Sequence, residues 1–193
     1  MPSASGTATV YLGSAHLAGL GAVEVATTDR GICAIALPQW NDHDLRLGAW
    51  EAAGYRAKRA PHVLITQAMA ELRAFTAGEA KGFRVPLDLR HLPPFTERVL
   101  RCLLRVPTGT LITYGQLAAK AGSPRASRAV GGAVGRNPIP VIIPCHRVVA
   151  GNGIGGFGLG LACKRVLLGM EGITNADDSQ GGEIPAASGG RRR

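Results

Sequence analysis

Residues 113–149 read TYGQLAAKAGSPRASRAVGGAVGRNPIPVIIPCHRVV, and this stretch decides the fold of the second half of the chain. Its beginning carries two helix patterns that are separated by a short turn containing glycine. Thr113 can cap a helix from 114 to 121, and Gly122 ends it. The order helix, turn, helix predicts a helix-turn-helix motif in a mainly α unit, although two packed helices of a structural bundle would give a similar pattern.

The second helix of this pair has an unusual composition. Ser123 as a cap and Pro124 at the first helical position predict that the helix opens there and runs to about residue 136. Ala, Ser and Gly dominate it, and Gly131 and Gly132 inside a helix cost about 2 kcal/mol relative to two alanines. A helix that carries this cost needs something close to its backbone, and both a packed helix and a DNA groove fit that need.

A reactive segment follows directly. Three prolines in residues 137–149 frame an apolar run that ends at Cys145, beside His146 and Arg147. A lone cysteine is usually a buried structural residue, but a neighbouring cation or imidazole lowers a thiol's pKa and favours the reactive thiolate. Adjacent side chains of an extended segment diverge, so either a turn bends the proton path from Cys145 to His146 or a water relays it. Glu171, placed against its preference at the C-terminal end of the last helix, would orient the histidine.

The charge of the chain is concentrated in the same half. The formal net charge is +9, and residues 86–172 carry 11 Lys and Arg against 3 Asp and Glu, whereas residues 1–85 carry 8 against 7. A solvated basic face is the ordinary explanation of such charge. Its concentration in one part of the chain favours a surface that meets phosphates.

Four stretches between about residues 86 and 172 resemble the O6-alkylguanine-DNA alkyltransferase family. They are RAVGGA (128–133), NP (137–138), IPCHRV (143–148) and KRVLLGME (164–171). The resemblance implies direct-reversal DNA repair, with one irreversible transfer of an alkyl group from O6-alkylguanine, and also from O4-alkylthymine, in double-stranded DNA to Cys145. It implies no cofactor, and a helix-turn-helix that binds the minor groove while the damaged nucleotide is flipped out of the duplex.

The resemblance also implies a role for each matching position. The catalytic residues would be Cys145, His146, Glu171, Asn137, which braces the turn, and Tyr114, which helps to rotate the phosphate and donates a hydrogen bond to guanine. The DNA-binding residues would be Arg128, which fills the gap in the base stack, Tyr114, Ala126, Ser127, Ala129 and Gly131. The base pocket would be Val134, Val148, Phe157 and Gly158. Phe157 stands where the family often has tyrosine, and Gly158 where it often has serine or alanine, which leaves the range of alkyl groups open.

The first part of the chain predicts a small α/β unit. Runs with β-branched residues predict strands at 10–12, 22–26 and 32–37, with a hairpin turn at 28–31 and a helix at 62–75. The family layout implies a ribonuclease H-like sheet with a helix here. A break in composition near Pro86 predicts three parts, namely an N-terminal domain (1–85), a C-terminal domain with the DNA-binding and active-site residues (86–172) and a disordered tail (173–193).

Composition and targeting signals set the expected compartment. The four cysteines form no C-x-x-C pair, the N-terminus lacks a signal-peptide pattern, and no stretch is apolar enough to span a membrane. We therefore expect a cytoplasmic protein with free thiols. We expect a monomer, and cooperative binding on DNA is left open.

Two other patterns are set aside. Gly151-x-Gly153-x-x-Gly156 matches a dinucleotide-binding fingerprint, but no helix is predicted to begin within it. Cys33, Asp42 and His43 match no standard metal-ligand spacing, so no metal site is predicted. Two rival functions stay open at this point, a non-reactive lesion binder or regulator, which the cysteine at 145 disfavours, and a Cys–His hydrolase, which would turn over without DNA.

Overall fold

The computed structural model of this 193-residue chain describes residues 8–40 and 47–174. Its strands are β1 (Thr9–Leu17), β2 (Gly21–Thr28), β3 (Gly31–Ala36), β4 (Arg56–Arg59), β5 (Ile112–Thr113) and β6 (Val148–Val149). Its helices are α1 (Leu47–Ala52), α2 (Val63–Thr76), α3 (Pro94–Leu103), α4 (Tyr114–Lys120), α5 (Ser127–Gly135) and α6 (Gly160–Met170), with the single 3-10 turn η1 (Cys145–Arg147). None of the helices in the described ranges is long and apolar enough to cross a membrane.

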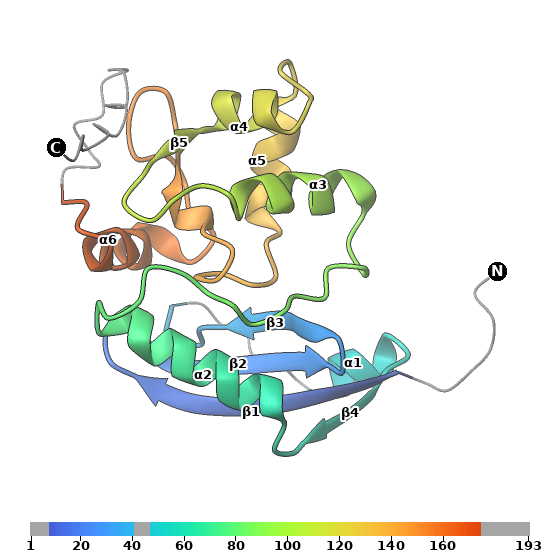
Figure 1. Ribbon diagram of the computed structural model, residues 1–193. Coiled ribbons are helices and arrows are strands. Elements are labelled where there is room, and N and C mark those ends of the chain that lie inside the picture. Colours follow the sequence, from blue (N-terminus) through green and yellow to red (C-terminus); the bar gives the residue numbers. More distant parts are fainter. Residues whose placement is uncertain (1–7, 41–46, 175–193) are drawn as a thin grey trace, which may run out of the picture.

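The first part is a four-stranded sheet with one long helix packed on it (Figure 1). The strand order is β3-β2-β1-β4, with β4 parallel to β1 and the other neighbours antiparallel. Helix α2 buries Ile65, Met69 and Leu72 against the sheet, as its spacing of apolar residues predicts. This confirms the predicted α/β unit, its three strands and its helix, whereas β4 and α1 were not predicted.

The outer edge of β3 faces the second part of the molecule, and backbone groups from that part cover it. The Ile32 amide donates to the Pro86 carbonyl at 2.8 Å, and the Ile35 amide donates to the Pro138 carbonyl at 2.8 Å. The Thr28 hydroxyl adds a 2.8 Å hydrogen bond to the buried Asp88 carboxylate. Because an uncovered edge strand invites foreign pairing, these contacts both protect the sheet and fix its position against residues 137–145.

The second part is mainly helical, with α3, α4, α5 and α6 around the two-stranded parallel pair β5-β6 (Figure 1). One cluster of buried apolar side chains runs from the sheet, for example Leu17 and Ile35, into this part, for example Leu100, Val130 and Leu167. The boundary expected near Pro86 stays a prediction, because this shared core joins both sides of it. Most of the tail expected from residue 173 lies outside the described residues.

The helix pair at 113–136 differs from its prediction at one end. Thr113 caps α4 as expected, accepting a hydrogen bond from the Gln116 amide at 3.2 Å within a complete capping box. The second helix, α5, begins at Ser127 rather than at Ser123 or Pro124. The Ala126 amide donates to the Ser123 carbonyl, so Pro124 occupies the second position of a tight turn, where its fixed φ is equally favourable.

Candidate active site

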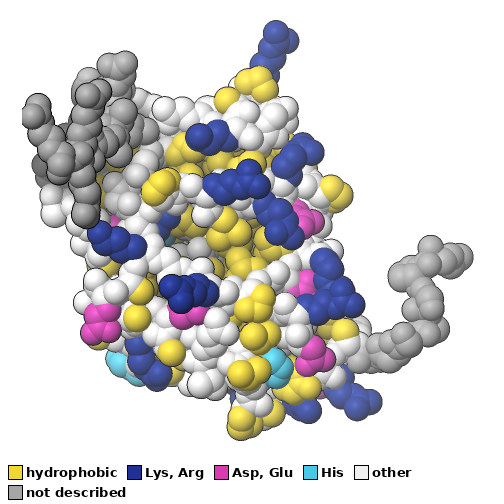
Figure 2. Space-filling model, in the orientation of Figure 1, with side chains coloured by type: hydrophobic (Ala, Val, Ile, Leu, Met, Phe, Trp, Pro, Cys, Tyr) yellow, Lys and Arg dark blue, Asp and Glu magenta, His cyan; other side chains and the backbone are white. Residues whose placement is uncertain are grey.

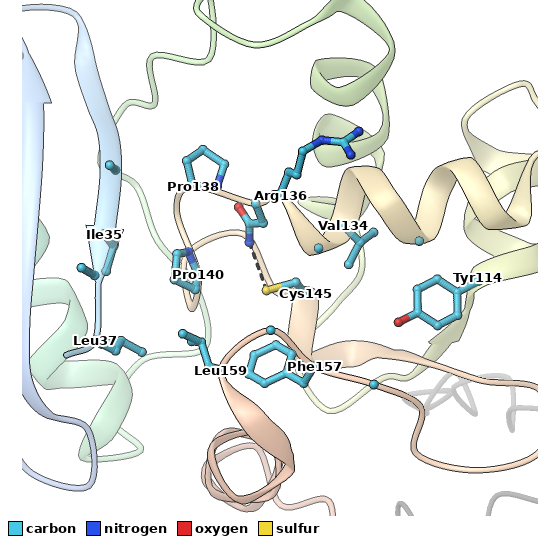
Figure 3. A pocket seen from close by; sticks show the side chains of 17 residues that line it. Ile35, Leu37, Tyr114, Val134, Arg136, Pro138, Pro140, Cys145, Phe157 and Leu159 are labelled. Carbon is cyan, nitrogen blue, oxygen red and sulfur yellow. Dashed lines mark hydrogen bonds between the residues drawn. The ribbon is translucent and has the colours of Figure 1, made fainter. Parts of the chain in front are cut away.

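Cys145 begins the 3-10 turn η1 and borders a cavity of about 580 Å³ between the two parts of the molecule (Figure 3). The residue is only 7% exposed and lies at the wall of this cavity. In Figure 3, Tyr114 and Val134 lie on one side of Cys145, Pro138, Pro140 and Ile35 lie on the other, and Phe157 lies below it. Cys145 therefore lies between residues of the helical part and a wall that the sheet and the loop before the cysteine form together.

The segment that leads to Cys145 is a strained loop and not an extended run. Val141 has a φ of 73°, a left-handed conformation that is rare for a β-branched residue, and the Ile143 amide bonds back to the Ile139 carbonyl at 2.9 Å. Such strain persists only where the surroundings over-determine it. The loop therefore holds the cysteine in one place.

Asn137 braces this loop from inside. Its Nδ2 donates to the Ile143 carbonyl at 2.9 Å and to the Sγ of Cys145 at 3.1 Å, and its Oδ1 accepts from the Ile139 amide at 3.0 Å. One amide side chain thus ties both ends of the loop and contacts the sulfur of Cys145 directly (Figure 3).

His146 points away from the cavity and into the protein, where it meets Glu171. Its Nε2 lies 2.8 Å from Oε1 of Glu171, and both side chains are fully buried. Glu171 is the C-cap of α6, so the end of the last helix delivers this carboxylate. The 3-10 turn is the bend that the sequence left open, and within residues 8–40 and 47–174 no hydrogen bond joins the Sγ of Cys145 to the imidazole.

Electrostatics fix the tautomer of His146. Burial alone would raise the pKa of Glu171, but hydrogen bonds from His146 and Arg147 outweigh burial and hold that pKa at about 2. Burial lowers the pKa of His146 against the opposing effect of Glu171, so the ring is neutral at pH 7. A neutral ring that donates Nε2–H to a carboxylate leaves Nδ1 as an acceptor, and Nδ1 is the one buried side-chain nitrogen or oxygen in the described chain without a hydrogen-bond partner.

The ionisation expected for Cys145 is wrong for the resting protein. Burial raises the pKa of the Cys145 thiol to about 11, although the Asn137 hydrogen bond lowers it in part. Arg147, the expected neighbouring cation, turns away, with its Nε 3.0 Å from both carboxylate oxygens of Glu171 and its guanidinium also on the Val106 carbonyl and the Thr108 hydroxyl. The resting group is therefore a thiol, and its reaction requires a base.

The expected base pocket is brought together with one exception. Val134, Phe157 and Gly158 border the cavity together with Tyr114 and Cys145. The side chain of Val148 is fully buried and does not border it. Its carbonyl accepts a 2.6 Å hydrogen bond from Nζ of Lys164 instead.

The expected DNA-binding residues lie on the outside of the helix pair. Ser127, Arg128 and Ala129 are exposed, Ala126 is half-buried, and Gly131 borders the cavity next to Tyr114. Figure 2 shows Lys and Arg side chains gathered on the half of the molecule that carries α3 and α4, with few acidic side chains among them. Helix α5 therefore runs from an exposed start to residues that border the cavity.

Comparisons with known proteins agree with this geometry. Residues 94–173 match the family model described as 6-O-methylguanine DNA methyltransferase, DNA binding domain. A methylated-DNA–protein-cysteine methyltransferase of Mycobacterium tuberculosis is 47% identical over 105 residues, which are 54% of this chain and 63% of that protein. One from Methanosarcina acetivorans is 45% identical over 107 residues, which are 55% of this chain and 68% of that protein.

Solved structures extend the similarity to both parts of the chain. The crystal structure of Mycobacterium tuberculosis OGT in complex with DNA superposes with a TM-score of 0.71 and 30% identity, over 86% of this chain and 95% of that one. This chain belongs to the methylated-DNA–protein-cysteine methyltransferase family. A family structure from Pyrococcus kodakaraensis, described as O6-methylguanine-DNA methyltransferase, superposes with a TM-score of 0.55 and 27% identity over 85% of this chain and 99% of that one.

Three features of this family member were not found from its sequence. The end of strand β3 and the residue after it, residues 34–37, supply one wall of the cavity, a contact between segments a hundred residues apart that no local pattern shows. The guanidinium of Arg147 donates hydrogen bonds to the carboxylate of Glu171 and does not contact the Cys145 thiol. Lys164 is fully buried beside the site, and an isolated lysine inside a helix pattern gives no signal of that.

The structure bears on the first of the two patterns that were set aside, but not on the whole of the second. Residues 151–158 contain no helix, and α6 begins only at Gly160, which removes the dinucleotide-binding geometry. Burial raises the pKa of Cys33 to about 12, and Asp42 and His43 lie outside the described residues. In the described part of the chain, no group of three or more His, Cys, Asp or Glu side chains could hold a metal ion.

Proposed function

We propose that the protein repairs DNA by accepting an alkyl group from the O6 position of guanine onto the sulfur of its own Cys145, once per molecule. One observation carries the proposal. A braced cysteine borders a cavity large enough for a small-molecule ligand, and a fully buried His146–Glu171 pair lies directly behind it. Membership of the family, whose matched members are named for this transfer, supports the same reaction.

The proton leaves the thiol through His146. Because the pKa of Cys145 is near 11, the S–H bond must be broken during the reaction, and Nδ1 of His146 is the available acceptor. A bridging water carries the proton over this step, since no direct hydrogen bond joins the two groups in the described structure. Glu171 stabilises the imidazolium that forms, with the role of the orienting carboxylate in a nucleophile–base–acid arrangement.

The sulfur then forms a bond to the alkyl carbon as the bond from that carbon to O6 breaks. The electron pair of the broken bond passes to guanine, and the hydroxyl of Tyr114, which borders the cavity, donates a hydrogen bond to the leaving base. The proton held by the His146 imidazolium then passes through solvent to the guanine anion, so that base and imidazole both return to their neutral forms. Burial raises the pKa of Tyr114, so its hydroxyl keeps its proton. The product is a thioether, which is stable, and the protein is not regenerated.

Recognition of DNA is assigned to α4 and α5 as a helix-turn-helix in the minor groove. A Cβ at Gly131 would meet the Tyr114 ring at 3.8 Å, an ordinary contact, so packing inside the protein does not require glycine there. Of the two explanations for the Gly-Gly pair, close approach of DNA is therefore favoured. The same surface carries small side chains that would let DNA come close, namely those of Ala126, Ser127 and Ala129.

We assign to Arg128 the role of filling the gap that the flipped nucleotide leaves in the base stack of the DNA. Its side chain is exposed, and within the described ranges it forms no hydrogen bond or ion pair that would hold it elsewhere. Flipping costs a few kcal/mol, and an inserted side chain offsets part of that cost. The everted base would then lie against Val134, Phe157 and Gly158, with main-chain groups near Val148 reading its edge.

The finer parts of the proposal follow the family resemblance. They are a ribonuclease H-like arrangement of the sheet, O4-alkylthymine as a second substrate, and a monomer as the active form. The strand order β3-β2-β1-β4 supports the ribonuclease H-like arrangement of the sheet. A separate point is the range of alkyl groups, for which the small residue Gly158 leaves more room.

Intact-protein mass spectrometry after mixing with an O6-methylguanine duplex tests the proposal. We expect one added methyl group, located on the peptide that contains Cys145, and no second turnover when DNA is in excess. The Cys145→Ala variant should bind the same duplex with unchanged affinity and gain no mass. A protein that binds the damaged duplex well but stays unmodified would contradict the proposed alkyl transfer. Repeated turnover on amide substrates would favour a hydrolase.

A further inference from the structure

A groove between α3 and the end of α4 lies outside the site described so far. Two hollows of about 420 and about 580 Å³ meet there, and Cys102, Arg105 and Lys120 border both of them. The described residues that line this groove are different from those that line the cavity of the reactive cysteine. The groove is therefore a separate feature of the second part of the molecule.

Four basic side chains line the groove. Arg98, Arg101 and Arg105 are spaced three and four residues apart, so they follow one side of α3 and of the turn after it. Lys120 borders the same hollow from the last turn of α4. All four side chains are exposed, and they belong to the half of the molecule on which Figure 2 shows Lys and Arg gathered.

The protein itself neutralises little of this charge. Glu97 is the one acidic side chain among the described residues of the groove, and it forms an ion pair with Arg101 at 2.7 Å. Within the described ranges, the side chains of Arg105 and Lys120 have no hydrogen-bond or ion-pair partner. Because a cleft lined by one sign of charge concentrates the electric field inside it, this groove attracts anions from solution.

The groove is continuous with the surface that is assigned to DNA. Ala121 and Gly122 border it, and they begin the turn that leads from α4 into the exposed start of α5 at Ser127. In helix-turn-helix proteins the helix before the recognition helix crosses the DNA backbone. Phosphate groups of the duplex are therefore the anions that would lie nearest to this groove.

We propose that the groove between α3 and α4 binds the sugar–phosphate backbone of the duplex, beside the minor groove that α5 enters. The inference rests on the proposed function for the assignment of α5 to the minor groove. Ion pairs from Arg105, Lys120 and their basic neighbours to phosphate oxygens would carry no sequence information, but they would fix the position of the protein on the duplex. Such contacts weaken as salt is added, because each releases counterions from the DNA.

The double variant Arg105→Gln/Lys120→Gln removes the two unpaired charges that border both hollows. Arg73→Gln/Lys81→Gln is the matched control, since it removes one exposed arginine and one exposed lysine from the first part of the chain. The dissociation constant of an undamaged duplex is measured for the wild type and both variants from about 50 to about 200 mM salt. Transfer from the free base O6-benzylguanine, which involves no DNA, and thermal unfolding serve as controls for the active site and the fold.

The salt dependence of binding reports the number of phosphate contacts, because each contact adds about 0.9 to the slope of log affinity against log salt concentration. We expect the groove variant to lose about 1.8 from this slope, so that between these salt concentrations its affinity falls by about tenfold less than that of the wild type. The control variant should keep the slope of the wild type. Transfer from O6-benzylguanine should be the same for all three proteins.

Cys102 gives an independent readout of the groove. It is the one partly exposed cysteine of the four, and it borders both hollows. We expect N-ethylmaleimide to label the peptide that contains Cys102 more slowly when the undamaged duplex is bound, as followed by mass spectrometry. Polyglutamate at the same concentration of charge should protect the thiol much less, because it lacks the contacts that α5 makes with the duplex.

Either a salt slope equal to that of the wild type or undiminished labelling of Cys102 on the duplex overturns the inference. An equal fall of the slope in the Arg73→Gln/Lys81→Gln control also counts against it, because net charge alone would then explain the effect. Equal protection by polyglutamate would show a general site for acidic polymers and would exclude the specific contact. If the wild type transfers nothing from O6-benzylguanine, the proposed function fails, whereas the salt and labelling measurements still decide whether the groove binds the duplex.

Discussion

The buried centre behind Cys145 and the exposed start of α5 lie in the same part of the molecule but are built in opposite ways. Behind the cysteine, the carboxylate of Glu171 accepts hydrogen bonds from His146, Arg147 and the Gly109 amide, and nothing of it is exposed. On α5, Ser127, Arg128 and Ala129 face solvent, and the helix has no side-chain cap. The centre around Glu171 is held by contacts within the protein, whereas the start of α5 presents side chains that face solvent and are open to contacts with another molecule.

This difference separates the reaction from recognition. A group that must move a proton needs fixed neighbours before the substrate arrives, because reorganisation during the reaction adds to the barrier. A surface that meets DNA gains from side chains that are free to be ordered by the partner. Changes in the buried centre should therefore slow transfer from every substrate alike, whereas changes at the exposed start of α5 should affect duplex DNA alone.

His146→Ala gives the largest expected effect and tests the buried half of this comparison. Loss of a general base lowers a rate by about 10²- to 10⁴-fold. We expect that loss for transfer from both free O6-benzylguanine and an O6-methylguanine duplex, measured as single-turnover rate constants, with duplex affinity retained. Glu171 would be left without one donor, so thermal unfolding is followed as a control, and a loss confined to the duplex would contradict the role as base.

Arg128→Ala tests the exposed half and should have the opposite selectivity. Flipping a nucleotide costs a few kcal/mol, and without the Arg128 side chain in the base stack less of this cost is offset. We therefore expect about 10- to 100-fold slower transfer from duplex DNA. Transfer from free O6-benzylguanine should stay within a factor of about two, since no flipping is involved. Arg73→Ala, which removes the same charge from α2 on the sheet, is the matched control. Equal losses on both substrates would exclude the flipping role.

The sequence predicted the parts of both regions that depend on local chemistry. The cap at Thr113, the apolar face of α2, and the candidates Cys145, His146 and Glu171 all follow from short patterns. Strand β4 was missed because Arg56–Arg59 has no apolar alternation and is defined only by pairing with β1. The β3 wall, the direction of Arg147 and the burial of Lys164 depend on contacts between distant segments, which no local pattern contains.

The start of α5 shows how one residue type can serve two structures. Proline at the first helical turn and proline at the second position of a tight turn need the same φ, so the residues around Pro124 fit both. The hydrogen bond from the Ala126 amide to the Ser123 carbonyl shows that these residues form a tight turn and not the first turn of the helix. The expected charge state of Cys145 failed because burial raises the pKa of the thiol, and because sequence proximity to Arg147 gave no information on where the guanidinium points.

The pH dependence of transfer sharpens the description of the buried centre. With the pKa of Cys145 near 11 and that of His146 below its usual value, the neutral pair is the main form across the neutral range. The rate constant with free O6-benzylguanine should therefore change by less than about threefold between pH 7 and pH 9, and should fall only in acid as His146 takes up a proton. If no base assisted the reaction, the rate would instead follow the small thiolate fraction of a thiol with a pKa of about 11, and would rise about tenfold per pH unit over the same range. Stopped-flow measurements at constant ionic strength distinguish the two profiles.

Gly131→Ala gives the smallest expected effect and joins the two regions, because this glycine lies on α5 and also borders the cavity. Alanine should stabilise the protein by about 0.5–1 kcal/mol, since its Cβ would meet Tyr114 at an ordinary 3.8 Å and the helix no longer carries a glycine. Affinity for duplex DNA should fall, because the methyl group lies where the groove approaches. Gly169→Ala on α6, where a Cβ meets nothing within 4 Å, should give a similar gain in thermal stability without any change in affinity. If both variants bind duplex DNA as the wild type does, the glycine has no part in recognition, and its cost in helix stability needs an explanation inside the protein.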